Sequence, residues 1–120
     1  MSYHRPKTIF CDIDGTLVYH SAPYACSKPD YNMELLDGTI SKLLEWDRKG
    51  YNIILTTGRR KSLRKQTERQ LAEAGIFYDE LIMGIGGGPR YIINDKKTDG
   101  RDAAFSISLD RDVGIKDIDL

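Results

Sequence analysis

One apolar segment that ends in two aspartates constrains this chain more than any other feature. Residues 7–12 form a short run rich in β-forming side chains, and the run continues into Asp12-Ile-Asp14-Gly15-Thr16. A short apolar run bounded by a turn signal predicts a buried strand. Gly15 lets the chain turn sharply after that strand. The pattern therefore places two carboxylates at the carboxyl end of a strand.

The rest of the chain alternates between helix and strand patterns. We expect helices from Asp37 or Thr39 to about Lys49 and over about 62–74, and strands over 51–56, 80–83 and 91–94. Residues 104–109 resemble an edge strand, and the polar tail after them is expected to be mobile at its end. Alternating strands and helices predict an α/β fold: a three-layer, Rossmann-like parallel sheet covered on both faces. Residues 1–120 then form a single domain without a large cap, in which about 16–33 form a loop or small flap.

Composition narrows the function classes. Lys plus Arg and Asp plus Glu both number 18, so a formal net charge of zero gives no argument for binding nucleic acid or a membrane. No apolar stretch approaches the roughly 18 residues of a membrane span. Two cysteines are too few for a disulfide framework, and Cys11 is expected as a buried free thiol. His4 and His20 lack metal-ligand spacing and are expected at the surface. These features favour a cytoplasmic protein.

Polar residues follow three of the predicted strands. Asp12 and Asp14 follow the first, Thr57-Gly58-Arg59 the second, and Asn94-Asp95 the strand over 91–94. Because the carboxyl ends of parallel strands meet at one edge of a sheet, we expect these residues to share a crevice. Converging carboxylates repel one another, and a bound Mg²⁺, which prefers oxygen ligands, removes that repulsion. It also neutralises an incoming phosphoryl group.

Phosphoryl transfer uses such residues directly. Asp12 is the candidate nucleophile, because a carboxylate can attack phosphorus to form an acyl-phosphate. Asp14 is the candidate acid and base, protonating the leaving oxygen and later deprotonating water. Thr57 offers a hydroxyl to a phosphoryl oxygen, with Gly58 and Arg59 beside it.

These motifs resemble the haloacid dehalogenase (HAD)-like phosphohydrolase superfamily. The resemblance rests on Asp12-Ile-Asp14-Gly15-Thr16-Leu17, on residues 53–59 and on residues 91–96, and it covers about 9–97. The small capless members that resemble capsule-biosynthesis phosphatases are the nearest in pattern. The resemblance implies that Asp12, the Asp14 main-chain carbonyl and Asp95 hold Mg²⁺, with Asn94 beside them.

Two positions depart from the family pattern. Asn94 stands where the family often has an acid. The lysine that binds phosphate is missing after Gly84, and Arg90 or Lys65 is the candidate to replace it. A further basic cluster opens the second predicted helix, where cations oppose the helix dipole, and it consists of Arg59, Arg60, Lys61, Arg64 and Lys65. Either an anionic ligand or a solvated basic face accounts for it.

The function these residues favour is an Mg²⁺-dependent phosphatase that acts on a small phosphorylated sugar or metabolite. One alternative is a nucleic-acid end phosphatase, which the neutral charge and the lack of an aromatic stacking platform disfavour. Another is a degenerate domain that binds a phosphorylated ligand without turnover. A third, a partner-binding domain, requires Asp12, Asp14 and Asp95 to lie apart. An open site without a cap is compatible with a homo-oligomer.

Overall fold

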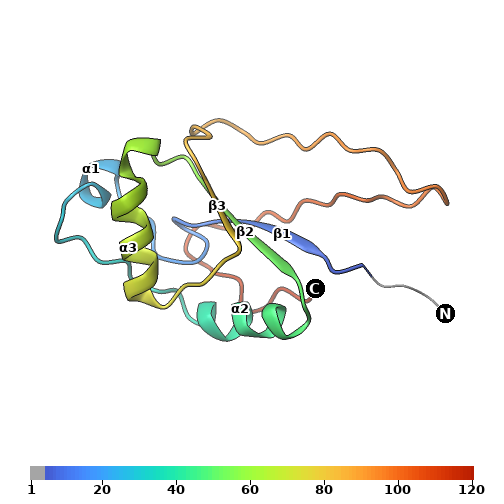
Figure 1. Ribbon diagram of the computed structural model, residues 1–120, viewed down its shortest axis with the longest axis horizontal. Coiled ribbons are helices and arrows are strands. Elements are labelled where there is room, and N and C mark those ends of the chain that lie inside the picture. Colours follow the sequence, from blue (N-terminus) through green and yellow to red (C-terminus); the bar gives the residue numbers. More distant parts are fainter. Residues whose placement is uncertain (1–4) are drawn as a thin grey trace.

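The computed structural model describes residues 5–120, except the side chain of Pro23, so His4 lies outside the described residues. Its elements are β1 (Thr8–Asp12), α1 (Pro23–Cys26), α2 (Thr39–Arg48), β2 (Asn52–Thr57), the 3-10 turn η1 (Lys61–Leu63), α3 (Arg64–Ala74) and β3 (Glu80–Met83). Figure 1 shows α2 and α3 packed around one sheet, with a long segment after β3 that leaves the body. The predicted α/β fold is confirmed.

The sheet has three parallel strands in the order β1-β2-β3. Cys11 of β1 lies opposite Leu55 of β2, which lies opposite Leu81 of β3, and all three are buried. Side chains alternate between the two faces of a strand, so this row marks the core face. Leu43 and Trp46 of α2 and Leu71 of α3 belong to the same core. The opposite face is less covered, since Phe10 is 56% exposed.

The ends of the helices agree with local sequence signals. Gly75 adopts a left-handed conformation after α3, the usual way to close a helix. The α2 helix matches its prediction closely, whereas α3 begins later than residue 62 because η1 winds the chain tightly first. Within residues 5–120, no helix is both long and apolar enough to cross a membrane.

The predicted strands over 91–94 and 104–109 do not form. Residues 86–110, called the arm from here on, leave the end of β3 as two extended limbs (Figure 1, orange to red). Neither limb pairs with a strand of the sheet, and their large apolar side chains are exposed to solvent, with Ile93 97% exposed. The radius of gyration is 15.3 Å, against about 13.6 Å for a compact chain of this length.

The end of the chain packs against the body, contrary to the expected mobile tail. Ile115 is buried in the core. The Asp112 amide donates a hydrogen bond to the Gly15 carbonyl at 2.8 Å, and Tyr51 donates its hydroxyl proton to the Leu120 carbonyl at 3.1 Å. Ile115, Ile118 and Leu120 pack on the core, and with these hydrogen bonds they hold a segment that was expected to be mobile from its polar composition.

We predict that both thiols resist modification in the folded protein. Cys11 and Cys26 are free and buried. Burial raises the pKa of both thiols, that of Cys11 to about 12. At pH 8 roughly one Cys11 in 10⁴ is then a thiolate, the reactive form. Titration with Ellman's reagent should detect two thiols promptly in 6 M guanidinium, about the usual denaturing concentration, and react slowly without it. Prompt reaction of native Cys11 would contradict this packing.

Candidate active site

The loop after β1 holds the two aspartates at the carboxyl edge of the sheet. Gly15 has a φ of 87°, a conformation that favours glycine. Its amide donates a hydrogen bond to the Val18 carbonyl at 2.8 Å. Asp12 stays exposed, Ile13 is buried, and Asp14 is half-buried. Asp12 is therefore accessible to solvent, whereas Asp14 turns toward the protein.

Asp12 has the surroundings of a reactive carboxylate. Its pKa is raised, chiefly because neighbouring atoms remove part of its hydration and also because Asp14 is close. The amide of Ile13, the positive charge of Arg90 and the hydroxyl of Thr16 act in the opposite direction. The Thr16 hydroxyl donates to Asp12 Oδ2 at 3.5 Å. Because the side chain remains exposed, the carboxylate is accessible as well as partly desolvated.

Asp14 is held by a two-point ion pair with Arg59. Arg59 Nε donates to Asp14 Oδ2 at 3.0 Å, and Arg59 Nη2 donates to Asp14 Oδ1 at 2.9 Å. The side chain of Arg59 is only 7% exposed, and that of Asp14 is 17% exposed. The pKa of Arg59 is raised: burial acts to lower it, and the hydrogen bonds and charge of Asp14 outweigh that effect. This charge is therefore committed to Asp14 in this structure, rather than free for a second anion.

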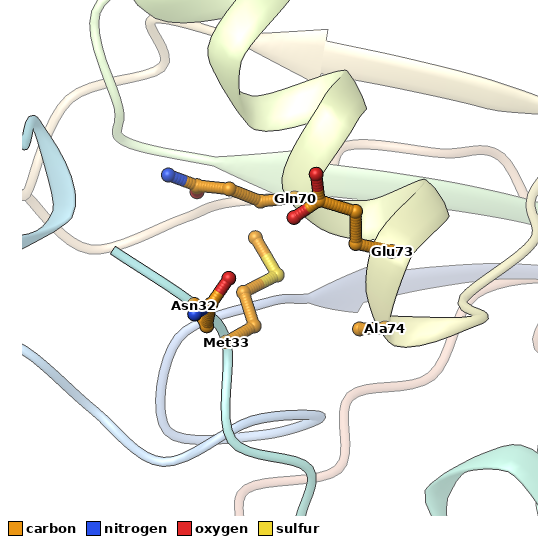
Figure 2. Close-up of a pocket in the computed structure, with 5 residues that line it drawn as sticks. All are labelled: Asn32, Met33, Gln70, Glu73 and Ala74. Carbon is orange, nitrogen blue, oxygen red and sulfur yellow. The ribbon is translucent and has the colours of Figure 1, made fainter. Parts of the chain in front are cut away.

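Helix α3 supports the same guanidinium from behind. Arg59 Nη1 donates to Gln70 Oε1 at 2.7 Å and to Thr67 Oγ1 at 3.3 Å. Gln70 Nε2 in turn donates to the Cys26 carbonyl of the flap at 3.3 Å. Figure 2 shows Gln70 leaving α3 toward the flap, above a cavity of about 170 Å³ beside Met33. Asp14, Arg59, Gln70 and the flap thus form one connected polar network.

The turn after β2 is shaped by a close backbone contact. Thr57 is buried, and its hydroxyl oxygen accepts a hydrogen bond from the Arg59 amide at 3.1 Å. A Cβ on Gly58 would lie 2.7 Å from the Gly86 carbonyl oxygen. Gly58 is therefore required for close packing against the first glycines of the arm, a role that the motif alone did not reveal.

The two cations proposed to replace the missing lysine differ in position. Arg90 donates to the carbonyls of Gly88 and Gly86, and its charge lowers the pKa of Asp12. Lys65 instead lines a shallow hollow of about 260 Å³ together with Pro29, Gln66 and Arg69. Of the two, Arg90 is therefore the cation whose charge acts on the pKa of Asp12.

The predicted magnesium ligands do not converge in this conformation. Asn94 and Asp95 lie exposed on the arm, where the Asn94 amide donates to the Asp95 carbonyl at 3.0 Å. Among residues 5–120, no group of three His, Cys, Asp or Glu side chains is placed to hold a metal ion. Asp12 and Asp14 alone do not make the expected site, because the strand that was to carry Asp95 to them is absent.

Sequence reasoning missed two contributors to the site. Gln70 is 1% exposed, and its signal was a polar side chain on the apolar face that carries Thr67 and Leu71. Asp112 Oδ1 accepts a hydrogen bond from the His20 amide at 2.8 Å, and the Asp112 amide bonds Gly15. No local pattern identifies Asp112, because its contacts join residues more than 90 positions apart.

Comparison with known proteins points to one family. Residues 6–96 match the protein-family profile HAD_PNKP, described as the polynucleotide kinase PNKP phosphatase domain. Among curated proteins, none matches the sequence significantly. The solved structure of a Pnkp1/Rnl/Hen1 complex superposes with a TM-score of 0.57 and 32% identity, over 72% of this chain and 30% of that one.

Two further structures are similar to this chain, one in sequence and fold and the other in fold alone. A second structure, of the Pnkp1/Rnl/Hen1 RNA repair complex, gives a TM-score of 0.55 and 32% identity, over 78% of this chain and 28% of that one. A structural-genomics target from Vibrio cholerae gives a TM-score of 0.51 and 20% identity, over 73% of this chain and 79% of that one. This similarity supports the fold alone. The chain therefore spans less than a third of the matched chain in each of the two Pnkp1/Rnl/Hen1 complexes. The HAD-like resemblance is confirmed, and these matches do not support the narrower likeness to capsule-biosynthesis phosphatases.

We predict that Gln70→Met destabilises the protein by about 1–3 kcal/mol, because it leaves a buried guanidinium hydrogen and the Cys26 carbonyl without this partner. Urea unfolding should show a lower midpoint with an unchanged slope. Glu73→Gln, on an exposed position one turn away, should stay within about 0.5 kcal/mol. Equal stability of Gln70→Met and the parent protein would show that the network contributes nothing.

Proposed function

The chain belongs to the HAD-like family of polynucleotide kinase PNKP phosphatase domains, and on that basis we propose that it removes a terminal phosphate from a nucleic-acid strand. The family match indicates a hydrolase. The observation that supports the proposal is that the match spans residues 6–96, which include Asp12 and the Asp14–Arg59 ion pair. The two matched chains belong to Pnkp1/Rnl/Hen1 complexes, one of them described as an RNA repair complex, and they support the same substrate class.

This proposal reverses the order of substrates that composition favoured. Net charge of zero argued against nucleic acid, yet whole-chain charge is a poor guide when cations gather at one place. Within residues 5–120, no large cap covers Asp12, which is exposed at the sheet edge. An open site admits the end of a long chain as readily as a small sugar phosphate, and the family match favours the former.

Residues of this chain are proposed to carry out both steps of the reaction, transfer of the phosphoryl group to Asp12 and its hydrolysis. Asp12 attacks phosphorus, so that a bond forms from its carboxylate oxygen while the bond to the leaving oxygen breaks. Asp14 is proposed to give that leaving oxygen a proton, a step for which one of its oxygens must leave Arg59 and carry the proton. Water then attacks phosphorus, Asp14 takes the water's proton, and the bond to Asp12 breaks to release inorganic phosphate. Arg59 fixes the orientation of Asp14, and Arg90 is proposed to bind the phosphate.

The arm is proposed to fold against the body when the enzyme works. HAD-like phosphatases typically use Mg²⁺, which supplies charge neutralisation when bound. Asp95 is the remaining acid of the motif, and it lies on the arm rather than beside Asp12. Exposed apolar side chains such as Ile93 and Phe105 favour a packed arm, because uncovered apolar patches are usually binding surfaces.

We predict that Asp12→Asn abolishes phosphate release, since an amide cannot act as the nucleophile. Oligonucleotides with a 5′- or 3′-terminal phosphate, p-nitrophenyl phosphate and a panel of sugar phosphates should be compared by kcat/KM. A phosphorylated oligonucleotide should be the best substrate, and turnover should stop with EDTA. Asp47→Asn, at an exposed position of α2, should retain activity. Preference for a sugar phosphate would refute the substrate class, and an active Asp12→Asn variant would refute the mechanism.

We predict that Mg²⁺ with inorganic phosphate slows trypsin cleavage of the arm by about tenfold, because a ligand that binds only the folded-back state stabilises it by mass action. The arm offers exposed trypsin sites after Lys96, Lys97 and Arg101. Asp95→Asn should remove the protection and Asp47→Asn should keep it. A cleavage rate independent of Mg²⁺ and phosphate would show that Asp95 is not a ligand.

A further inference from the structure

Some cations of the basic cluster after β2 form ion pairs within the protein, and others do not. Arg59 is bound to Asp14. Arg64 Nη1 lies 3.3 Å from Glu68, and Arg64 Nη2 donates to the Leu81 carbonyl at 2.9 Å. Lys61 and Lys65 are exposed, and neither forms an ion pair with any residue in the described range 5–120. Two of the five members, Arg59 and Arg64, therefore have structural partners, whereas the exposed Arg60, Lys61 and Lys65 form no ion pair within residues 5–120.

Lys61, Lys65 and Arg69 form a line along one side of α3, here called the basic stripe. The three residues are spaced four apart across η1 and α3, so neighbouring cations lie about 6 Å apart along the axis. Residues four apart share a helix face, where like charges cost about 0.2–0.5 kcal/mol per pair. The first turn of α3 holds no acid, and cations there also oppose the helix dipole.

The basic stripe runs from the candidate site to the flap. The methylene chain of Lys61 lies against Gly84, where a Cβ would meet Lys61 Cγ at 3.0 Å. Gly84 follows β3 at the sheet edge, and its amide donates to the Arg59 carbonyl at 2.8 Å. At the other end, Lys65 and Arg69 line the 260 Å³ hollow beside Pro29. Arg69 donates to the Pro29 carbonyl at 3.0 Å.

We propose that the basic stripe Lys61–Lys65–Arg69 binds the sugar–phosphate backbone of a single-stranded nucleic acid whose terminal phosphate lies at Asp12. This inference rests on the proposed function and names where the rest of the substrate binds. Evenly spaced, exposed cations suit a repeating anion, because each phosphate that a cation neutralises releases a condensed counterion. One acid reduces the charge of the stripe, since Glu73 lies 4.0 Å from Arg69 Nε.

The test compares two double variants that alter the same positions. Lys61→Gln/Arg69→Gln removes two charges, whereas Lys61→Arg/Arg69→Lys keeps both. Arg48→Gln/Lys49→Gln removes two exposed charges at the end of α2. Binding of a fluorescein-labelled, terminally phosphorylated DNA or RNA strand of about ten nucleotides is followed by anisotropy between 50 and 200 mM salt, approximately the range over which such contacts weaken.

The charge-removing variant should bind on the order of 50-fold more weakly at 50 mM salt, with a slope of log K against log salt shallower by about 1.4, or 0.7 for each lost cation. The charge-keeping and α2 variants should stay within about twofold of the parent protein, because neither changes the charge of the stripe. An unchanged slope in Lys61→Gln/Arg69→Gln, an equal loss in the α2 variant or no binding by the parent would overturn the proposal. Tight binding through the basic stripe without phosphate release would refute the proposed function, whereas the proposal that the stripe binds nucleic acid would still hold.

Discussion

The rest of the molecule depends on the buried ion pair between Asp14 and Arg59, which joins segments that are far apart in the chain. It connects the loop after β1 to the turn after β2, and through Gln70 it reaches α3 and the flap. Removing one partner of such a pair typically costs about 3–5 kcal/mol, because the other charge is left buried. Two hydrogen bonds from a planar guanidinium also fix the plane of the carboxylate. Stability and the orientation of Asp14 therefore come from the same contact.

Local patterns predicted the sheet and its carboxyl edge well. Cys11, Leu55 and Leu81 lie side by side as short apolar runs in a parallel sheet require, and Asp12 emerges at the expected end. Residues 91–94 have an equally strong strand pattern and form no strand, because a strand needs a neighbour and the pattern carries no information on pairing. The predicted assembly of Asp12 with Asp95 is absent in this conformation for that reason.

Side-chain roles were harder to predict than strand positions. Arg59 was expected near an anionic ligand, and in the structure it pairs with Asp14, which is 45 residues away in the chain. Gly58 was expected to contact phosphate, and the structure shows that it makes room for the Gly86 carbonyl. Both outcomes depend on contacts between distant segments. A motif specifies which residue types gather at a site, whereas the tertiary packing decides which of them contact one another.

Some residues of the basic cluster after β2 stabilise the fold, whereas others are available to bind a substrate. Arg59 and Arg64 have protein partners, whereas Lys61 and Lys65 leave their charges to solvent or ligand. Net neutrality of the whole chain is compatible with this, because acids elsewhere balance the sum without changing the local field. The charge that matters to an incoming nucleic acid is the one along α3.

The central claim is that Asp12 becomes covalently phosphorylated. Acid quenching during turnover, followed by peptide mass spectrometry, measures this directly. The account predicts one phosphoryl group on the peptide that contains Asp12, appearing with substrate and absent from Asp12→Asn. Release of phosphate while that peptide stays unmodified at every quench time, or modification of another residue in its place, would contradict the account.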